Sequence, residues 1–302
     1  MLLQQALNSL VLGSMYSIVA LGFTLYFGMV NLINFAHGDL CALGAFVFLL
    51  VSSFLSGHAV SASALYFGVA AIASIVLCTV TGLLSERFLF RPVRRGHPLE
   101  GLIISIAFSM VIREAILRFY PNGGNPQQFP DPFRQQSVQL FGVGVSYSQV
   151  FLMSVCVLSA VLFYCIVAQT HFGRTMRALS QDSEAAIMIG LPVNRTIIGA
   201  FALGAILAAV AGILNGSVYG SVKFDMGLSL GVKGFVAAVV GGLDNPNGAI
   251  IGGMLLAFLE TSAISFVPGG SAYRDIIAFC LLLAVLLIRP AGLLMRNSRP
   301  SA

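Results

Sequence analysis

The chain has 302 residues, of which 58% are hydrophobic and only 9% are charged, and its formal net charge is +5. A soluble domain carries about 25% charged residues, so this chain has too few charges to cover a water-facing surface. The composition therefore predicts an all-α polytopic integral membrane protein. It also argues against a nucleic-acid partner, because the basic residues lie at the ends of apolar stretches.

About eight transmembrane helices are expected, because several uncharged stretches exceed the roughly 20 residues that cross a bilayer as a helix. A shorter apolar stretch, about 231–241, either is re-entrant or joins residues 226–230 in a tilted crossing. The whole chain, 1–302, is expected to form a single transmembrane domain. The predicted spans are about 6–28, 34–55, 63–84, 99–118, 147–168, 196–219, 249–267 and 274–289.

Basic segments set the expected orientation, because cytoplasmic loops are enriched in Lys and Arg. Segments 85–98 and 169–195 and the C-terminus are rich in arginine and are predicted to be cytoplasmic. The loop at about 119–146 is rich in Pro, Gly, Asn and Gln and is predicted to be external. Because successive spans carry the chain from one side of the membrane to the other, the segments near Lys223 and at 268–273 are also predicted to be external. The sequence does not decide on which side of the membrane the N-terminus lies.

A polar interruption, NLINFAHGD at residues 31–39, lies between long stretches without charge. Irregular backbone at membrane depth is tolerated only where it is buried in protein or lines water. Broken helices at matching places in two halves of a chain indicate a translocation site. We therefore expect Asn34, Phe35, His37 and Gly38 to line a translocation path. The alternatives are an ordinary surface turn, or a metal or proton site at His37.

A second polar interruption, VVGGLDNPNGAIIGG at residues 239–253, is loosely parallel to the first. In both, Asn leads a short polar turn that ends in Gly, and small residues follow. On this parallel, Asn245 and Gly248 are also expected to line the path. The alternative is a surface turn, because Asn-Pro and Asn-Gly are turn signals. Such a turn would face the cytoplasm if 231–241 crosses the membrane.

Ionisable residues inside predicted spans are functional candidates by default. Mutual pairing is the simpler interpretation, with Lys233 beside Glu260 and Arg113 beside a carboxylate of a neighbouring helix. The five cysteines lie in apolar stretches and are interpreted as small buried hydrophobes. Because the chain has no phosphate-binding loop, metal-ligand motif or nucleophile motif, we expect no metal, no cofactor and no catalytic residues.

The segment 172–195, FGRTMRALSQDSEAAIMIGLPVNR, is too polar to span a membrane and too long for a tight turn. Ser180 or Asp182 can cap a short helix there. The helix is expected to end near Gly190, before a Leu-Pro pair. A short helix at a basic cytoplasmic face suits the docking of a soluble partner.

Glu184-Ala185-Ala186 followed by Gly190 resembles the coupling-helix motif of ABC importer permeases. Together with NLINFAHGD, GRTMRALSQD, GGLDNPNGAIIGG and the C-terminal YRDIIAFCLLLAVLLIRPAGLL, it makes the chain similar to permeases of the branched-chain amino acid importer family. The resemblance runs from about residue 5 to Leu294 and is strongest to the shorter of two paired permeases. The coupling residues that it implies are Arg177, Ala178, Asp182, Glu184, Ala185, Ala186 and Gly190.

The resemblance implies a pore shared with a second, homologous permease in the inner membrane. Cytosolic ABC ATPase subunits would hydrolyse ATP on separate chains, and a soluble binding protein would deliver branched-chain or other hydrophobic amino acids, or related small solutes. Asp244 departs from the family pattern, so no substrate contact is assigned to it. The alternative is a secondary transporter or channel without an ATPase, with Asp39, His37 or Glu260 as its ion site. Such a protein would not need the short helix in 172–195.

Overall fold

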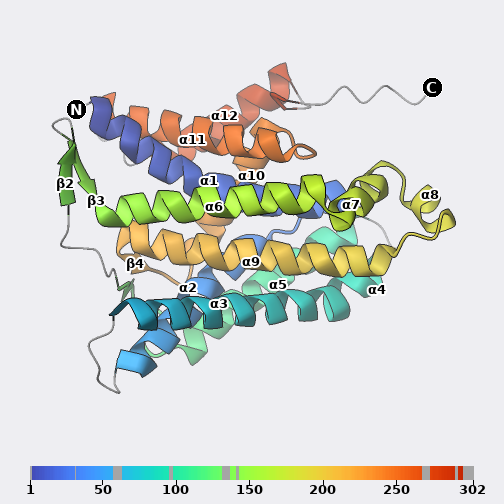
Figure 1. Cartoon of the computed structure of the whole chain (residues 1–302), viewed down its shortest axis with the longest axis horizontal. Coiled ribbons are helices and arrows are strands. Elements are labelled where there is room, and N and C mark those ends of the chain that lie inside the picture. Colours follow the sequence, from blue (N-terminus) through green and yellow to red (C-terminus); the bar gives the residue numbers. More distant parts are fainter. Residues whose placement is uncertain are drawn as a thin grey trace.

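The computed structural model shows a bundle of helices that run between two opposite ends (Figure 1). We call the end that carries the short strands the strand end, and the end that carries α7 and α8 the α8 end. The residues that the structure describes are 2–30, 32–56, 63–94, 98–130, 137–140, 143–266, 273–289 and 292–294.

The elements follow the apolar stretches closely. The π-helical turn η1 (Glu86–Phe90) and the short α4 (Arg91–Val93) continue α3 without a break. Two strand pairs are antiparallel, β1 (Gln127–Gln128) with β4 (Ser221–Val222), and β2 (Ser137–Leu140) with β3 (Val143–Ser146). The other helices are α1 (Leu2–Val30), α2 (Ala36–Ser56), α3 (Ser63–Ser85), α5 (Pro98–Phe119), α6 (Tyr147–Gln169), α7 (His171–Gln181), α8 (Ser183–Met188), α9 (Val193–Tyr219), α10 (Met226–Gly241), α11 (Pro246–Phe266) and α12 (Arg274–Ile288).

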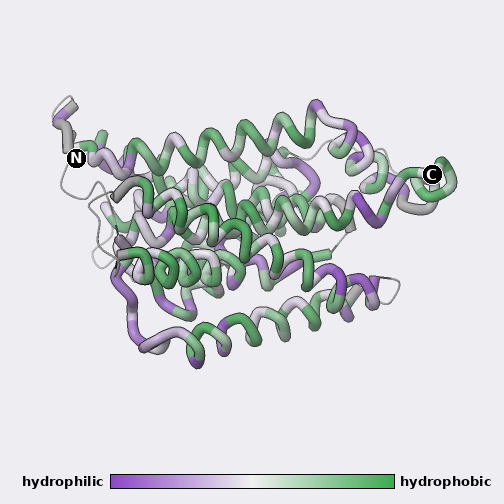
Figure 2. The backbone as a smooth tube through the Cα atoms, turned by 60° about the horizontal axis from the view of Figure 1, so that its bottom comes forward, coloured by the Kyte–Doolittle hydropathy of each residue, from purple (hydrophilic) through white to green (hydrophobic). Residues whose placement is uncertain are grey.

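Within the described residues, six helices are long and apolar enough to cross a membrane: α1, α2, α3, α6, α9 and α11. Figure 2 shows hydrophobic residues along the helices and many of the hydrophilic ones toward the ends. The all-helical membrane fold is confirmed, but the count of about eight spans is not. The predicted span 99–118 lies in α5, which carries four charged residues, and α12 has only 15 residues, fewer than the roughly 20 that a bilayer requires.

The short apolar stretch 231–241 is the C-terminal part of α10, a continuous helix of 16 residues that begins at Met226. The stretch therefore joins residues 226–230 in one helix, and a crossing of the membrane by that helix stays a prediction. Its C-terminal carbonyls face the C-terminal segment, where the amide nitrogen of Leu293 donates to the Val240 carbonyl at 2.9 Å.

Helix α1 lies at the centre of the bundle, against α9, α10 and α11, and α2 packs against α3, α9 and α10. Lipid gives no hydrophobic driving force between helices, so close backbone approach holds them together. A Cβ atom at Gly212 of α9 would overlap the Cys41 carbonyl of α2, and one at Gly252 of α11 would overlap the Ala237 carbonyl of α10. These glycines therefore let the helix backbones approach closely.

The two ends separate the segments that the charge pattern assigns to opposite sides. Pairing of β1 with β4 puts the 119–146 loop and the Lys223 segment at one end. At the other end, Arg94 Nη1 donates to Asn194 Oδ1 at 3.0 Å, which joins segments 85–98 and 169–195. Helix α1 begins at the strand end, beside α6. The following residues of the predicted loops and tail lie outside the described residues: 95–97, 131–136, 141–142, 268–272, 290–291 and 295–302.

The cysteines are all free thiols. Cys41, Cys78 and Cys156 are buried, as predicted, and Cys165 is half-buried. The prediction is wrong for Cys280, which is exposed on the outer side of α12. An apolar stretch in a membrane protein can face lipid as readily as protein, and composition alone does not distinguish the two.

Candidate functional site

The first polar interruption is buried inside the protein. Leu32–Phe35 is not helical, and the Asn34 side chain is fully buried. Asn34 caps α2, because its Oδ1 accepts from the Ala36 amide at 3.1 Å and its carbonyl accepts from the His37 amide at 3.2 Å. The Phe35 amide donates to Ser105 Oγ of α5 at 3.2 Å. Side chains of the protein thus accept the hydrogen bonds of backbone amides that would otherwise need water in a buried, irregular segment.

His37 lies in the first turn of α2 rather than in the polar turn that the sequence indicates. Its imidazole is fully buried, with ring centroids 5.2 Å from Phe23 and 5.6 Å from Tyr26. Neither ring nitrogen has a hydrogen bond in the described part of the chain, although the Val19 carbonyl lies close. The ring occupies the space that a side chain at Gly22 would fill. Among the described residues, no cluster of three or more His, Cys, Asp or Glu is arranged to hold a metal ion.

Asp39 is the carboxylate that pairs with Arg113. Arg113 Nη2 of α5 lies 3.2 Å from Asp39 Oδ2, and the Ser109 hydroxyl donates to the same oxygen. The prediction that Arg113 pairs with a neighbouring helix is confirmed. The pair ties α5 to the buried start of α2.

Gly38 lies in a close helix crossing. A Cβ atom there would overlap the Gly227 carbonyl and lie 2.6 Å from the Gly231 Cα atom of α10. Gly38, a predicted path residue, therefore contacts the backbone of α10. The two helices can cross this closely only because glycine has no side chain.

Replacing Gly38 by alanine is expected to lower the free energy of unfolding by about 1–3 kcal/mol, the usual cost of overpacking. Gly68→Ala is the matched control, because Gly68 is an exposed residue of α3 with open space around it. That control is expected to be neutral or up to about 1 kcal/mol more stable, from helix propensity alone. Thermal unfolding of both variants in the same detergent checks the difference. Equal stability of the two variants would contradict the close crossing.

The second polar interruption is a turn between two complete helices. Asn245 Oδ1 accepts from the Asn247 amide at 3.0 Å, and Asn245 Nδ2 donates to the Leu294 carbonyl at 2.9 Å. Gly248 packs against the Gly241 carbonyl, and α11 then runs unbroken from Pro246. The segment is therefore a capped turn between α10 and α11, and its place in a translocation path stays a prediction. The contacts of Asn245 and Gly248 are with α10 and the C-terminal segment, so the structure does not bring them to the Asn34 segment.

A second charged cluster joins α1, α10, α11 and α12. Lys233 Nζ lies 3.1 Å from Glu260 Oε1 and 3.5 Å from Asp275 Oδ1. Tyr16 donates its hydroxyl hydrogen to Glu260 Oε2 at 2.9 Å. The predicted pairing of Lys233 with Glu260 is confirmed. Sequence reasoning missed Tyr16 and Asp275, which carry no pattern that separates them from other span residues.

The segment 172–195 forms two helices, α7 and α8. Asp182 Oδ1 accepts from the Ala185 amide at 2.9 Å, so Asp182 caps α8 as predicted. The helix ends at Gly190, where φ is 77° and the amides of Gly190 and Leu191 donate to the carbonyls of Ile187 and Ala186, both at 3.0 Å. This double hydrogen bond is the Schellman ending that favours glycine.

Helix α8 projects from the bundle (Figure 1), and apolar residues at its end are exposed. Ile187 and Met188 are 62% and 83% exposed, whereas Ala186 is buried. We call Ile187, Met188 and Ile189 the α8 tip. On α7, Ala178 is half-buried and the Arg177 guanidinium donates to the Val167 carbonyl of α6. Ala185 is exposed, and the Glu184 side chain lies outside the part of the chain that the structure describes.

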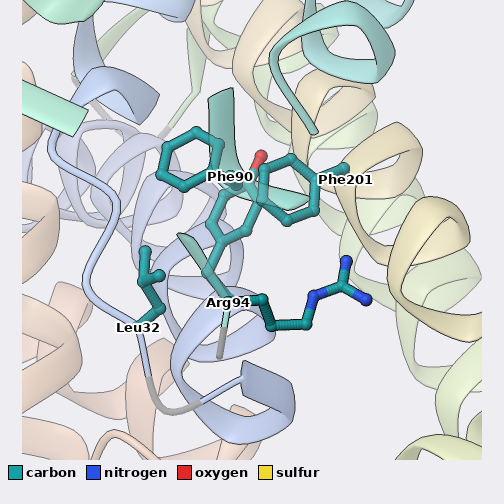
Figure 3. Close-up of a pocket in the computed structure, with 5 residues that line it drawn as sticks. Leu32, Phe90, Arg94 and Phe201 are labelled. Carbon is teal, nitrogen blue, oxygen red and sulfur yellow. The ribbon is translucent and has the colours of Figure 1, made fainter. Parts of the chain in front are cut away.

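Sequence reasoning missed a small cleft at the α8 end of the bundle. Its lining residues come from α1, from the segment before α2, from η1, from the end of α4 and from α9. Figure 3 shows Phe90, Phe201 and Leu32 around it, with the Arg94 side chain extending toward α9. Arg94 forms an ion pair with Glu86. Burial lowers the pKa of the Arg94 guanidinium from its ordinary value, and the Glu86 carboxylate opposes that shift. The lining residues are Tyr26, Leu32, Phe90, Arg94 and Phe201.

Comparison with known proteins gives a consistent result. A family model described as branched-chain amino acid transport system, permease component, matches residues 5–286. The chain is 33% identical over 296 residues to the high-affinity branched-chain amino acid transport system permease protein BraD of Pseudomonas aeruginosa, with 97% of this chain and 96% of BraD covered. It is 32% identical over 298 residues to the corresponding LivH protein of Escherichia coli, with 97% and 96% covered.

A solved structure, PsaBC from Streptococcus pneumoniae in complex with Fab, contains a chain of similar fold. The alignment has a TM-score of 0.51 and 15% identity, and it covers 94% of this chain and 91% of that one. At this identity the likeness supports the fold alone.

Proposed function

Since the chain belongs to the family of branched-chain amino acid permease components, we propose that it forms the translocation path of an ABC importer. The solutes proposed are branched-chain or other hydrophobic amino acids, or related small molecules. The chain is a non-catalytic, multi-pass membrane subunit, and ATP hydrolysis belongs to a separate chain. The family match over nearly the whole chain supports one permease domain.

The observation that carries the proposal is the α8 tip. Large apolar side chains exposed at the end of a bundle lie beyond the helices that lipid covers, so water would surround them unless a partner does. The tip follows the Glu184-Ala185-Ala186 motif and is held by an Asp182 cap and a Gly190 ending. A rigid, short helix with an apolar end fits a cleft in a soluble ATPase subunit.

The proposed orientation follows from this docking. The α8 end, with segments 85–98 and 169–195 and the C-terminal segment, faces the cytoplasm, as the excess of arginine also favours. The strand end, with the start of α1 and the 119–146 loop, faces outside. There a soluble binding protein delivers the solute, and a second, homologous permease completes the pore within the lipid bilayer of the inner membrane.

The secondary-transporter alternative with Asp39 or Glu260 as its ion site needs a carboxylate that is free to bind an ion. Asp39 is paired with Arg113 at 3.2 Å, and Glu260 is paired with Lys233 at 3.1 Å. Both carboxylates are thus neutralised by helix-to-helix ion pairs. These pairings favour a structural role for the intramembrane charges.

Purification of the chain from its native membranes in mild detergent, followed by mass spectrometry, tests the proposal. We expect ABC ATPase chains and a second multi-span permease in the same complex. Recovery of this chain alone, in a detergent that preserves a known ABC importer from the same membranes, would contradict the proposal. Asp39 and Glu260 would then be the ion-site candidates to test.

A further inference from the structure

The cleft formed by Tyr26, Leu32, Phe90, Arg94 and Phe201 has an apolar wall and two polar groups. We call it the Tyr26–Arg94 cleft. Phe90 and Phe201 lie with ring centroids 5.2 Å apart, and Tyr26 lies 4.9 Å from Phe201. The aromatic rings and Leu32 suit an apolar group of modest size. Tyr26 and Arg94 are the side chains of the lining that can hydrogen-bond a ligand.

The Tyr26 hydroxyl is the unusual feature of this cleft. The side chain is 1% exposed, and its oxygen has no hydrogen bond within the described residues, although the Asn34 amide is a polar neighbour. A buried hydroxyl without a partner destabilises the fold relative to a satisfied one. Phenylalanine would fill the same space without this cost. The hydroxyl therefore points to a partner that is present in another state of the protein.

The backbone beside the cleft is also unusual. Phe90 belongs to η1, a π-helical turn, and Arg94 follows it after α4. Such turns are rare and occur frequently at functional sites. The space in the cleft is about that of one water molecule, so the described conformation is closed. Outward movement of η1 and α4 would widen the cleft, because both Phe90 and Arg94 lie on that segment.

The chemistry of the two polar groups selects the ligand. A tyrosine hydroxyl can donate, and a guanidinium donates only and is cationic. Arg94 uses one nitrogen for Glu86 and another for Asn194, so further N–H donors remain. Two hydrogen-bond donors, one of them a guanidinium whose charge is balanced by Glu86, suit the oxygens of a carboxylate, and the aromatic wall suits an apolar body attached to it.

We propose that the Tyr26–Arg94 cleft binds the transported solute before its release to the cytoplasm, with Tyr26 and Arg94 as donors to a carboxylate. This inference rests on the proposed function and narrows it. The solute is a small carboxylic acid with an apolar side chain, such as an apolar amino acid, rather than a neutral amide. Tyr26 is then a specificity-determining residue at the inner end of the path.

The test uses the purified complex in lipid nanodiscs, with Leu32→Cys as a reporter at the cleft. Modification of this cysteine by a polar maleimide is followed by mass spectrometry, with L-leucine or L-leucinamide as the probe. L-leucine is expected to slow the modification, and L-leucinamide, which lacks the carboxylate, is not. Adding Tyr26→Phe is expected to raise the L-leucine concentration needed for half-protection about tenfold, from the loss of one hydrogen bond to a charged group.

Thermal unfolding without ligand separates a binding role from a structural one. Tyr26→Phe is expected to unfold at the same or a higher temperature, because it removes an unsatisfied hydroxyl. A lower unfolding temperature would show that the hydroxyl supports the fold, and would overturn the inference. Equal protection by L-leucinamide, or unchanged L-leucine protection in Tyr26→Phe, would also overturn it.

The same experiment distinguishes failure of this inference from failure of the proposed function. Absence of protection in a complex that performs ATP-driven L-leucine uptake overturns the cleft alone. Protection with the expected Tyr26→Phe shift, in a chain that purifies without an ATPase, supports the cleft and contradicts the ABC importer.

Discussion

Replacing Ile187 and Met188 together by aspartate is expected to abolish ATP-driven uptake while the chain stays folded in the membrane. These side chains are 62% and 83% exposed, so their replacement removes no core contact. In a docked interface, the change buries two charges in place of apolar surface, and central apolar residues each contribute about 2 kcal/mol or more to binding. Uptake of radiolabelled leucine in cells, scaled to the amount of chain in the membrane, checks the result.

The matched control for the α8 tip is Gln181→Asp. Gln181 is exposed at the end of α7, one residue before the Asp182 cap. This variant adds negative charge near α8 without changing its apolar end, and uptake close to that of the parent chain is expected. Recovery of the ATPase with the double tip variant, together with normal uptake, would remove the assignment of α8 as the docking element.

Replacing Lys233 by methionine is expected to destabilise the chain strongly. Glu260 is 0% exposed, and the substitution would leave its carboxylate without the ammonium group 3.1 Å away. Removing one partner of a buried ion pair costs about 3–5 kcal/mol. Unfolding of the purified chain in mixed micelles, with increasing denaturant, measures this loss.

Two further variants identify the cause. Adding Glu260→Leu to Lys233→Met is expected to restore most of the stability, because the uncompensated charge is then gone. Asp275→Asn is expected to cost less than about 1 kcal/mol, since Asp275 is 71% exposed and lies 3.5 Å from Lys233. A loss in Lys233→Met that the double variant does not restore would point to packing of the lysine stem instead of the buried charge.

The parts of the fold that depend on local chemistry could be predicted from the sequence. Asp182 and Gly190 mark the ends of α8 because capping involves only neighbouring backbone groups. The pairing of Lys233 with Glu260 was predictable for a different reason. Charges are so rare in the spans that each has few possible partners.

The depth of a polar turn could not be predicted. Asn34 and Asn245 both cap a helix, through an amide two residues later in each case. Asn34 is fully buried, whereas Asn245 contacts the C-terminal segment at the end of α10. The capping chemistry is the same, and the surrounding helices decide which turn is enclosed. For this reason two interruptions that look parallel in the sequence differ in burial.

The Tyr26–Arg94 cleft could not be found from sequence for a related reason. Its residues come from α1, from the segment that continues α3, and from α9, which lie far apart along the chain. Arg94 was visible only as part of a basic loop, and that pattern indicates a side of the membrane. No periodicity marks a buried hydroxyl that lacks a partner.

The connections on either side of α8 have a mechanical consequence. A single residue, Asp182, separates α7 from α8, and the segment from α8 to α9 contains Pro192, whose ring fixes its backbone torsion. Such short and stiff connections leave little slack, so a push on α8 moves the start of α9 as well. Because α9 is one continuous helix that carries Phe201 against Tyr26 at 4.9 Å, a movement that an ATPase imposes on α8 and thereby on the start of α9 would reach the aromatic wall of the cleft.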